Sequence, residues 1–200
     1  MKIITVTGFK GGVAKSITSY NLAHFLAKDG VTVLMDSDPN RCCESMARRA
    51  GEQIQFRVCN EATVHKHTRT ADWLLIDTPA RPNSNQIAEI CEGSDLVILP
   101  IVPDPFGVEV GIQTMNALLP NTLYRGLLTI CPPYPSKEPT KVKEALAEIG
   151  MPLFQTQIPR TASFTHAALA GVPVVLLPGA SPSGTNAAKN LAREVLELMK

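Results

Sequence analysis

The segment from Gly8 to Ser16, Gly-Phe-Lys-Gly-Gly-Val-Ala-Lys-Ser, constrains the fold of this chain more than any other. It follows a short β-rich run, residues 3–7, and opens a stretch with helical spacing. In such a strand–loop–helix unit the glycines let backbone N–H groups turn inward around an anion, and the positive end of the helix dipole reinforces them. Lys15 is placed to reach the β- and γ-phosphates of a nucleotide, and the Ser16 hydroxyl to hold Mg²⁺. The segment therefore predicts a phosphate-binding loop.

The segment does not match the generic pattern GxxxxGK[ST]. The first glycine of that pattern falls on Phe9 and the second on Ala14. A glycine-rich turn with two solvated lysines is the alternative interpretation. Acidic residues further along the chain favour the phosphate-binding loop.

Two apolar runs end in acids. Asp36 and Asp38 follow the run at 33–35, and Asp77 follows the run at 73–76. The carboxyl ends of parallel strands line the crevice in which open α/β sheets bind ligands. Buried carboxylates there need a partner, which Mg²⁺ with phosphate supplies. For Asp36 or Asp38 taken alone, capping of the next helix remains an open alternative.

Apolar runs alternate with helical patterns along the whole chain. This order predicts an α/β fold, a P-loop NTPase with a mainly parallel sheet covered by helices on both faces. With 200 residues, we expect a single P-loop ATPase domain over residues 1–200. The expected strands are 3–7, 31–35, 54–58, 73–76, 96–101, 127–131 and 174–177, and the expected helices are 17–27, 41–50, 86–91, 108–118, 141–149, 163–170 and 185–199.

Composition limits the classes of function. The net charge is +1, so any binding to nucleic acid must come from a local patch. The five cysteines are odd in number and include no CxxC pair, which favours reduced thiols in a cytosolic protein. No run approaches the roughly 20 apolar residues of a membrane span. We therefore expect a cytoplasmic protein without a transmembrane segment.

Three motifs together resemble the ParA/MinD family of deviant Walker A ATPases. They are the sequence from Lys10 to Ser16, Asp36-Ser37-Asp38-Pro39, and the strand-ending Asp77-Thr78-Pro79. Pro103-Asp104-Pro105-Phe106 and Ile158-Pro159-Arg160-Thr161 are also similar to family segments, so the likeness runs over nearly the whole chain. The short length is most similar to the compact partition and carboxysome-positioning members.

The resemblance implies an ATPase that binds ATP and Mg²⁺ and forms a face-to-face homodimer in the ATP state. It implies that Lys10 reaches the partner's phosphates, that Lys15 binds phosphate in its own chain, and that Asp38 positions the attacking water. Ser16, Asp36 and Asp77 are the implied Mg²⁺ residues, directly or through water. The implied nucleotide-binding residues are Lys10, Gly11, Gly12, Val13, Ala14, Lys15, Ser16 and Ile17.

Four positions depart from the family pattern: Ala14, Ile17, Asn40 and Cys131. Ala14 stands where a glycine is usual, and its Cβ crowds the loop if the position needs unusual backbone angles. Cys131 is expected to end a strand where many relatives have an asparagine that contacts adenine. The adenine contacts are therefore not assigned.

The last helical segment carries a basic stripe. Lys189, Arg193 and Lys200 fall within about 40° of each other on one helix face, which suits contacts to the phosphates of non-specific DNA. A solvated face of an ordinary helix is the alternative. A membrane-anchoring helix is the other, although Glu194 and Glu197 oppose attraction to anionic lipid.

Three functions remain open. The first is a positioning ATPase that is associated with the nucleoid, released by an adaptor protein of the partition type, and moves a cargo such as a carboxysome or a plasmid. The second is a metabolic P-loop enzyme of the same fold. The third is a module that holds nucleotide without hydrolysis, which Ala14 favours and Asp38 opposes.

Overall fold

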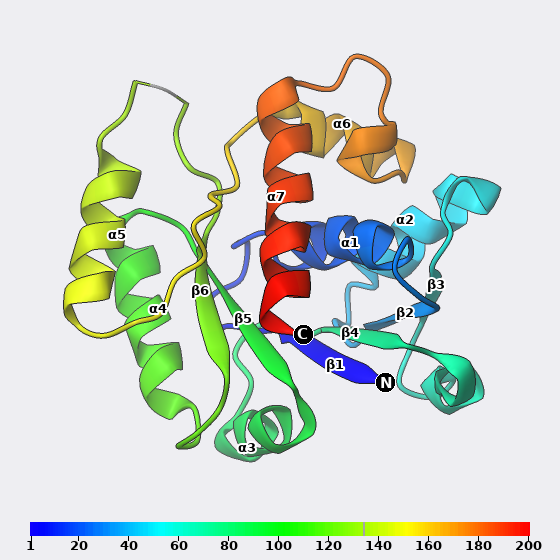
Figure 1. The fold of residues 1–200 in the computed structure, drawn as a ribbon, viewed down its shortest axis with the longest axis horizontal. Coiled ribbons are helices and arrows are strands. Elements are labelled where there is room, and N and C mark those ends of the chain that lie inside the picture. Colours follow the sequence, from blue (N-terminus) through cyan, green and yellow to red (C-terminus); the bar gives the residue numbers. More distant parts are fainter. Residues whose placement is uncertain (134) are drawn as a thin grey trace.

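The computed structural model describes residues 1–133 and 135–200 (Figure 1). Its centre is a six-stranded sheet in the order β3-β2-β4-β1-β5-β6, in which every pairing is parallel. The strands are β1 (Lys2–Val6), β2 (Thr32–Asp36), β3 (Arg57–Cys59), β4 (Trp73–Asp77), β5 (Leu96–Ile101) and β6 (Tyr124–Leu128). The predicted α/β class is confirmed.

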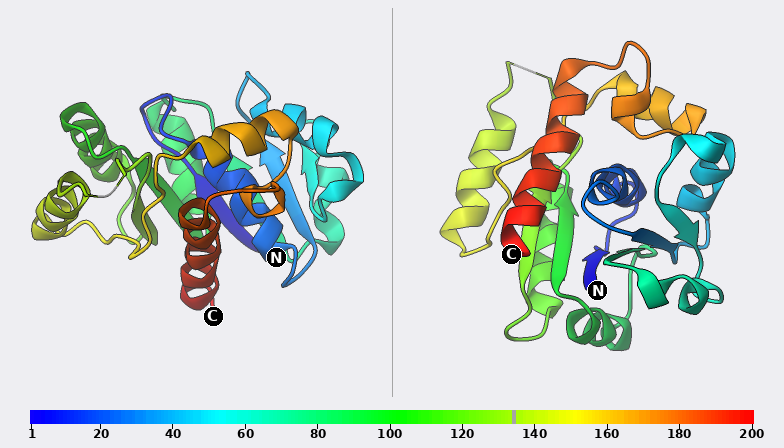
Figure 2. Two further views of the ribbon diagram at one scale, coloured as in Figure 1. Left: turned by 90° about the horizontal axis from the view of Figure 1, so that it is seen from above. Right: turned by 45° about the vertical axis from the view of Figure 1, so that its right-hand side comes forward.

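Helices connect the strands and lie on both faces of the sheet (Figure 2). In the described residues the α-helices are α1 (Lys15–Leu26), α2 (Cys42–Ala50), α3 (Ser84–Gly93), α4 (Pro105–Ala117), α5 (Glu138–Glu148), α6 (Ala162–Ala170) and α7 (Pro182–Leu198). Crossover helices are what parallel strands require, because the chain must return to the same end of the sheet before each new strand.

The alternation of side chains along each strand divides the core between the two faces. Ile4 of β1 packs in a large cluster with residues of α1, α2, α6 and α7, whereas Ile3 packs with a smaller cluster on the other face. Ile101 and Leu128 pack against α4 and α5. Both faces are therefore covered, which explains why the strands are continuously apolar.

The register of the central strands brings the two strand-ending acids together. Asp36 of β2 is paired with Asp77 of β4, and Asp77 is also paired with Val6 at the end of β1. The loop that follows β1 thus begins beside both carboxylates. The sheet itself positions the candidate site.

One expected strand is wrong. The run at 174–177 forms a 3₁₀ helix, η4 (Val174–Leu176), and not a strand. The N–H of Val174 donates to Oδ1 of Asn21 on α1 at 2.8 Å, and the Val174 side chain is fully buried. Packing against the helical layer overrides the β-propensity of this short apolar run.

Other boundaries moved by a few residues. The expected strand at 54–58 is reduced to β3, and the strand expected at 127–131 begins at Tyr124 and ends at Leu128. α4 begins at Pro105 because the Asp104 side chain caps it and proline suits the first helical turn. Among residues 1–133 and 135–200, no helix has the length and apolar character needed to cross a membrane.

Candidate functional site

The loop between β1 and α1 presents its backbone N–H groups to an anion. It reaches α1 through two residues with positive φ, Gly12 at 72° and Ala14 at 65°. Five backbone N–H groups of this segment donate no hydrogen bond within the described part of the chain. They belong to Gly11, Gly12, Ala14, Lys15 and Ser16. Such unpaired donors at a helix N-terminus suit phosphate oxygens.

Two threonines from distant elements hold this loop in place. The hydroxyl of Thr129, just after β6, donates to the Val13 carbonyl at 3.1 Å. The hydroxyl of Thr114 on α4 accepts from the Phe9 N–H at 3.3 Å. The sequence gave no sign of either contact, because each joins residues more than a hundred positions apart.

Lys15 is buried at the start of α1, with only 7% of its surface exposed. Its Nζ donates to the Lys10 carbonyl at 3.3 Å, so the amine points back across the loop. Burial lowers the pKa of Lys15, and the charges of Asp77 and Asp38 oppose that shift. A phosphate bound in the loop would provide the missing negative charge.

Asp77 is fully buried at the end of β4. Burial raises its pKa to about 6, with a further upward contribution from Asp36, against the hydrogen bond from Ser16 and the charge of Lys15. Ser19 Oγ donates to Oδ1 at 3.4 Å, and Cys43 Sγ donates to Oδ2 at 3.5 Å. The positive charge and hydrogen bonds near this carboxylate therefore do not fully compensate its negative charge.

The residues expected to hold Mg²⁺ differ in how far their oxygen atoms are already engaged in hydrogen bonds. The Ser16 hydroxyl and the Asp77 carboxylate are hard oxygen donors beside each other, and a divalent cation fits the deficit of positive charge there. Asp36 is more constrained, because Oδ1 accepts from the Asp38 N–H at 3.3 Å and Oδ2 from the Glu44 N–H at 3.0 Å. Asp36 thus holds the first turn of α2 through the Glu44 N–H, although the N-cap position itself is Arg41 and not an aspartate.

Asp38 is half-buried on the turn after β2. Its Oδ1 accepts from both the backbone N–H and the side-chain amide of Asn40 at 2.8 Å. In the described residues Oδ2 has no hydrogen-bond donor, and the charge of Asp38 acts on Lys15 of the loop. Arg41 adopts a positive φ of 50°, and its guanidinium donates to the Asp36 carbonyl and to Glu61.

The remaining predicted residues lie at the edges of the site. The Lys10 side chain is about one-third exposed, and its Nζ contacts Asp104. Ile17 packs partly against the main core, and its carbonyl accepts from the Asn21 amide.

Two cysteines have environments that the sequence did not indicate. Cys43 is buried against Asp77, and burial together with the charges of Asp77 and Asp36 raises its pKa well above the usual value, so it remains a thiol. Cys131 does not end a strand: it lies three residues beyond β6 in an isolated bridge with Pro159, and burial raises its pKa to about 12.

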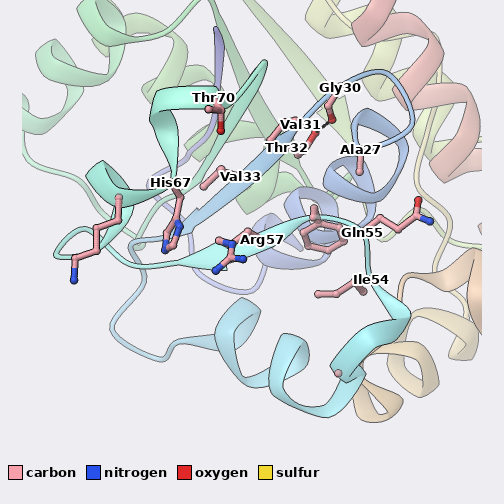
Figure 3. Close-up of a pocket in the computed structure, with 13 residues that line it drawn as sticks. Ala27, Gly30, Val31, Thr32, Val33, Ile54, Gln55, Arg57, His67 and Thr70 are labelled. Carbon is pink, nitrogen blue, oxygen red and sulfur yellow. Dashed lines mark hydrogen bonds between the residues drawn. The ribbon is translucent and has the colours of Figure 1, made fainter.

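A separate open groove of about 890 Å³ lies at the other end of β2 (Figure 3). It is lined in part by Ala27 after α1, by Thr32 at the start of β2 and by Arg57 of β3, with Lys66 and His67 on a neighbouring connection. Because α1 runs from Lys15 to Leu26, this groove is roughly 18 Å from the phosphate loop. It is not part of the candidate nucleotide site.

Comparisons with known proteins agree with this geometry. The family model for the CobQ/CobB/MinD/ParA nucleotide binding domain matches residues 4–174. The Maintenance of carboxysome distribution protein A of Gloeobacter kilaueensis is 29% identical over 181 residues, which cover 87% of this chain and 84% of the relative. The structure of the cell division protein MinD from Aquifex aeolicus matches with a TM-score of 0.78 at 17% identity, and 98% of each chain is covered. An ATP complex of McdA from Cyanothece matches with a TM-score of 0.72 at 14% identity over 100% of this chain and 96% of that one. The two structures show that the fold is that of a P-loop NTPase.

The first prediction concerns the stability of the nucleotide-free protein. Because the folded-state pKa of Asp77 is raised from 3.8 to about 6, the folded protein binds this proton more readily than the unfolded chain. The free energy of unfolding therefore falls as the pH rises from about 4 to about 6. Above that range it is lower by about 2–3 kcal/mol. Asp77→Asn is expected to raise the melting temperature at pH 7.5 in EDTA and to flatten this pH dependence, while weakening the Mg²⁺ dependence of nucleotide binding.

The control for this prediction is Asp95→Asn. The Asp95 carboxylate is exposed and accepts from the Ile3 N–H at 2.7 Å, so its loss should change stability little and in the opposite direction. A lower melting temperature for Asp77→Asn at pH 7.5 would show that the buried charge of Asp77 does not destabilise the folded protein.

The second prediction concerns Ala14. A non-glycine residue in the left-handed region costs about 1–2 kcal/mol, whereas a new glycine costs about 0.4–1 kcal/mol through the unfolded chain. Ala14→Gly is therefore expected to stabilise the protein by about 0.5–1 kcal/mol, or roughly 1–4 °C in thermal unfolding. Ala27→Gly is the matched control, because Ala27 has φ of −64° and gains nothing from glycine. Equal destabilisation by both substitutions would show that Ala14 carries no strain.

Proposed function

Since this chain belongs to the CobQ/CobB/MinD/ParA family of nucleotide-binding domains, we propose that it is a single-domain ATPase over residues 1–200 that positions a cellular cargo. The observation that carries the proposal is the loop of unpaired N–H groups with buried Lys15 on one side and the uncompensated Asp77 on the other. The likeness to a carboxysome distribution protein supports a carboxysome, or a plasmid, as the cargo.

The proposed reaction converts ATP to ADP and phosphate. The loop N–H groups and Lys15 bind the β- and γ-phosphates, and Ser16 with Asp77 would hold Mg²⁺, which neutralises charge on the phosphates. Asp36 keeps the turn after β2 in place through its backbone hydrogen bonds. The open Oδ2 of Asp38 orients the attacking water.

ATP also drives two copies together in this proposal. Lys10 then contacts the nucleotide of the partner chain, as the family resemblance implies. The exposure of Phe106, 73%, supports a contact surface near this lysine, since Phe106 lies two residues beyond the Asp104 that Lys10 contacts. An adaptor protein would accelerate hydrolysis and so separate the two copies.

The third prediction tests the enzyme. Asp38→Ala is expected to keep ATP bound but to lower the rate of phosphate release by at least about 100-fold, because phosphoryl transfer depends on the placement of the nucleophile. Glu52→Ala removes an exposed carboxylate elsewhere and should have no effect. Phosphate release without any small co-substrate would separate this ATPase from a metabolic enzyme. An unchanged rate in Asp38→Ala would remove Asp38 from the mechanism.

The proposed DNA surface is the outer face of α7. Lys189 and Arg193 are exposed there, and Lys200 is exposed just beyond the end of the helix at Leu198, while Leu191 and Val195 pack into the core. Glu197 is exposed on the same side and reduces the three positive charges to a net of two. Glu194 has a structural role, because its carboxylate accepts the N–H groups of Gln155 and Thr156, both at 2.7 Å.

The fourth prediction tests this surface. Binding of non-specific DNA should need ATP, because only a dimer presents the stripe twice, and the slope of log K against log salt should steepen by about 0.9 for each added phosphate contact. Replacing Lys189 and Arg193 with glutamate should abolish DNA binding and leave ATP binding intact. Equal DNA affinities and equal salt slopes with ATP and with ADP would show that DNA binding does not depend on the ATP-bound dimer.

The charge-matched control replaces Arg57 and Lys66, which line the groove of Figure 3, with glutamate. These exposed cations lie away from α7, so their loss should leave DNA binding largely unchanged. Loss of binding in the control alone would place the DNA surface at the groove. Imaging of a tagged chain beside the nucleoid and candidate cargoes then tests the proposed nucleoid association in cells.

A further inference from the structure

Lys10 is held within its own chain by a carboxylate that the proposed reaction does not use. Its Nζ donates to Oδ1 of Asp104 at 3.4 Å, and the two side chains are 34% and 42% exposed. The contact joins the phosphate loop to the start of α4, 94 positions away in the sequence. It is one of two ion pairs in the described residues, and the other, between Arg41 and Glu61, lies on the opposite side of the site.

The position of the Asp104 carboxylate is fixed by α4. Its Oδ1 also accepts the Gly107 N–H at 2.7 Å, which caps the helix. Gly107 is itself fixed, because a Cβ there would approach the Val102 carbonyl oxygen to 2.3 Å. Thr114, one of the two threonines that hold the loop, lies on the same helix. The carboxylate is therefore a fixed acceptor, and the flexible lysine is the member of the pair that can move.

A lysine in this position has two competing acceptors. In the isolated chain the acceptor is Asp104, whereas in the proposed dimer it is the phosphate of the partner's nucleotide. One ammonium cannot occupy both places. An ion pair this exposed is worth only a modest factor in an equilibrium, so it can be exchanged for a more highly charged phosphate.

We propose that Asp104 retains Lys10 in the unassembled chain and that dimer formation exchanges Asp104 for the partner's bound nucleotide. The contact then acts as a latch against assembly without ATP. This inference rests on the proposed function, since it assumes that Lys10 acts in the partner's site. Asp104 is a positioning residue that acts through Lys10.

The test uses Asp104→Asn, because asparagine caps a helix as well as aspartate and removes only the charge. Sedimentation with a non-hydrolysable ATP analogue gives the dimer dissociation constant. A pair of this kind is worth a factor of about 1.4 to 5, and each dimer breaks two, so the dissociation constant should fall by about 2- to 30-fold. Glu109→Gln removes an exposed carboxylate from the same helix and should leave the constant unchanged.

A second readout follows Lys10 directly in the nucleotide-free chain. Mass spectrometry after brief acylation should show faster modification of Lys10 in Asp104→Asn than in wild type, relative to Lys28 as an internal reference. This measurement needs neither ATP nor a dimer. Melting curves of both variants confirm that the fold is retained.

The outcomes separate the latch from the proposed function. A weaker or unchanged dimer in Asp104→Asn overturns the latch, and so does an unchanged acylation rate of Lys10. If wild type and variant both stay monomeric with the analogue, the exchange fails together with the proposed dimer, and the acylation rates then show only whether the contact exists. If wild type forms the dimer and Asp104→Asn does not tighten it, the exchange alone fails and the proposed function stands.

Discussion

The buried carboxylate of Asp77 is the charge on which the arrangement of this site depends. It lies where β1, β2 and β4 end side by side, with Asp36 as its neighbour in the register. Two carboxylates this close and this buried cannot both be satisfied by the hydrogen bonds present, and burial accordingly raises the pKa of both. The folded chain stores this cost and recovers it when a cation binds. In the proposed function, an Mg²⁺-nucleotide complex would therefore stabilise the fold and occupy the site through the same interaction.

The phosphate loop near Asp77 also keeps unsatisfied groups in the folded chain. Its N–H groups are left without acceptors, and Ala14 adopts a left-handed conformation that glycine would take more easily. Threonines from α4 and from the end of β6 hold the loop in this shape before any ligand arrives. Preorganisation of this kind places the cost in the folding of the protein, so that binding of phosphate does not bear it.

The sequence predicted the parts of the site that lie next to each other along the chain. An apolar run followed by an acid was sufficient to locate Asp36 and Asp77, and a strand followed by a glycine-rich segment located the loop. It could not predict the contacts of Thr114 or Asp104, because no local pattern encodes a pairing across about a hundred residues. The strand predicted at 174–177 was wrong for a related reason. β-branched residues favour a strand, but the hydrogen bond that the Val174 N–H donates to Asn21 and packing against the helices determined the structure.

The two lysines of the loop have environments that suit different tasks. Lys15 is buried and desolvated, so its charge needs a fixed anion nearby. Lys10 is partly exposed and held by a single carboxylate, so exchange of its acceptor costs little desolvation. A residue that must change partners has to retain access to solvent, whereas one that must fix a phosphate gains from exclusion of water. Burial therefore separates, within one short loop, a lysine suited to binding from a lysine suited to assembly.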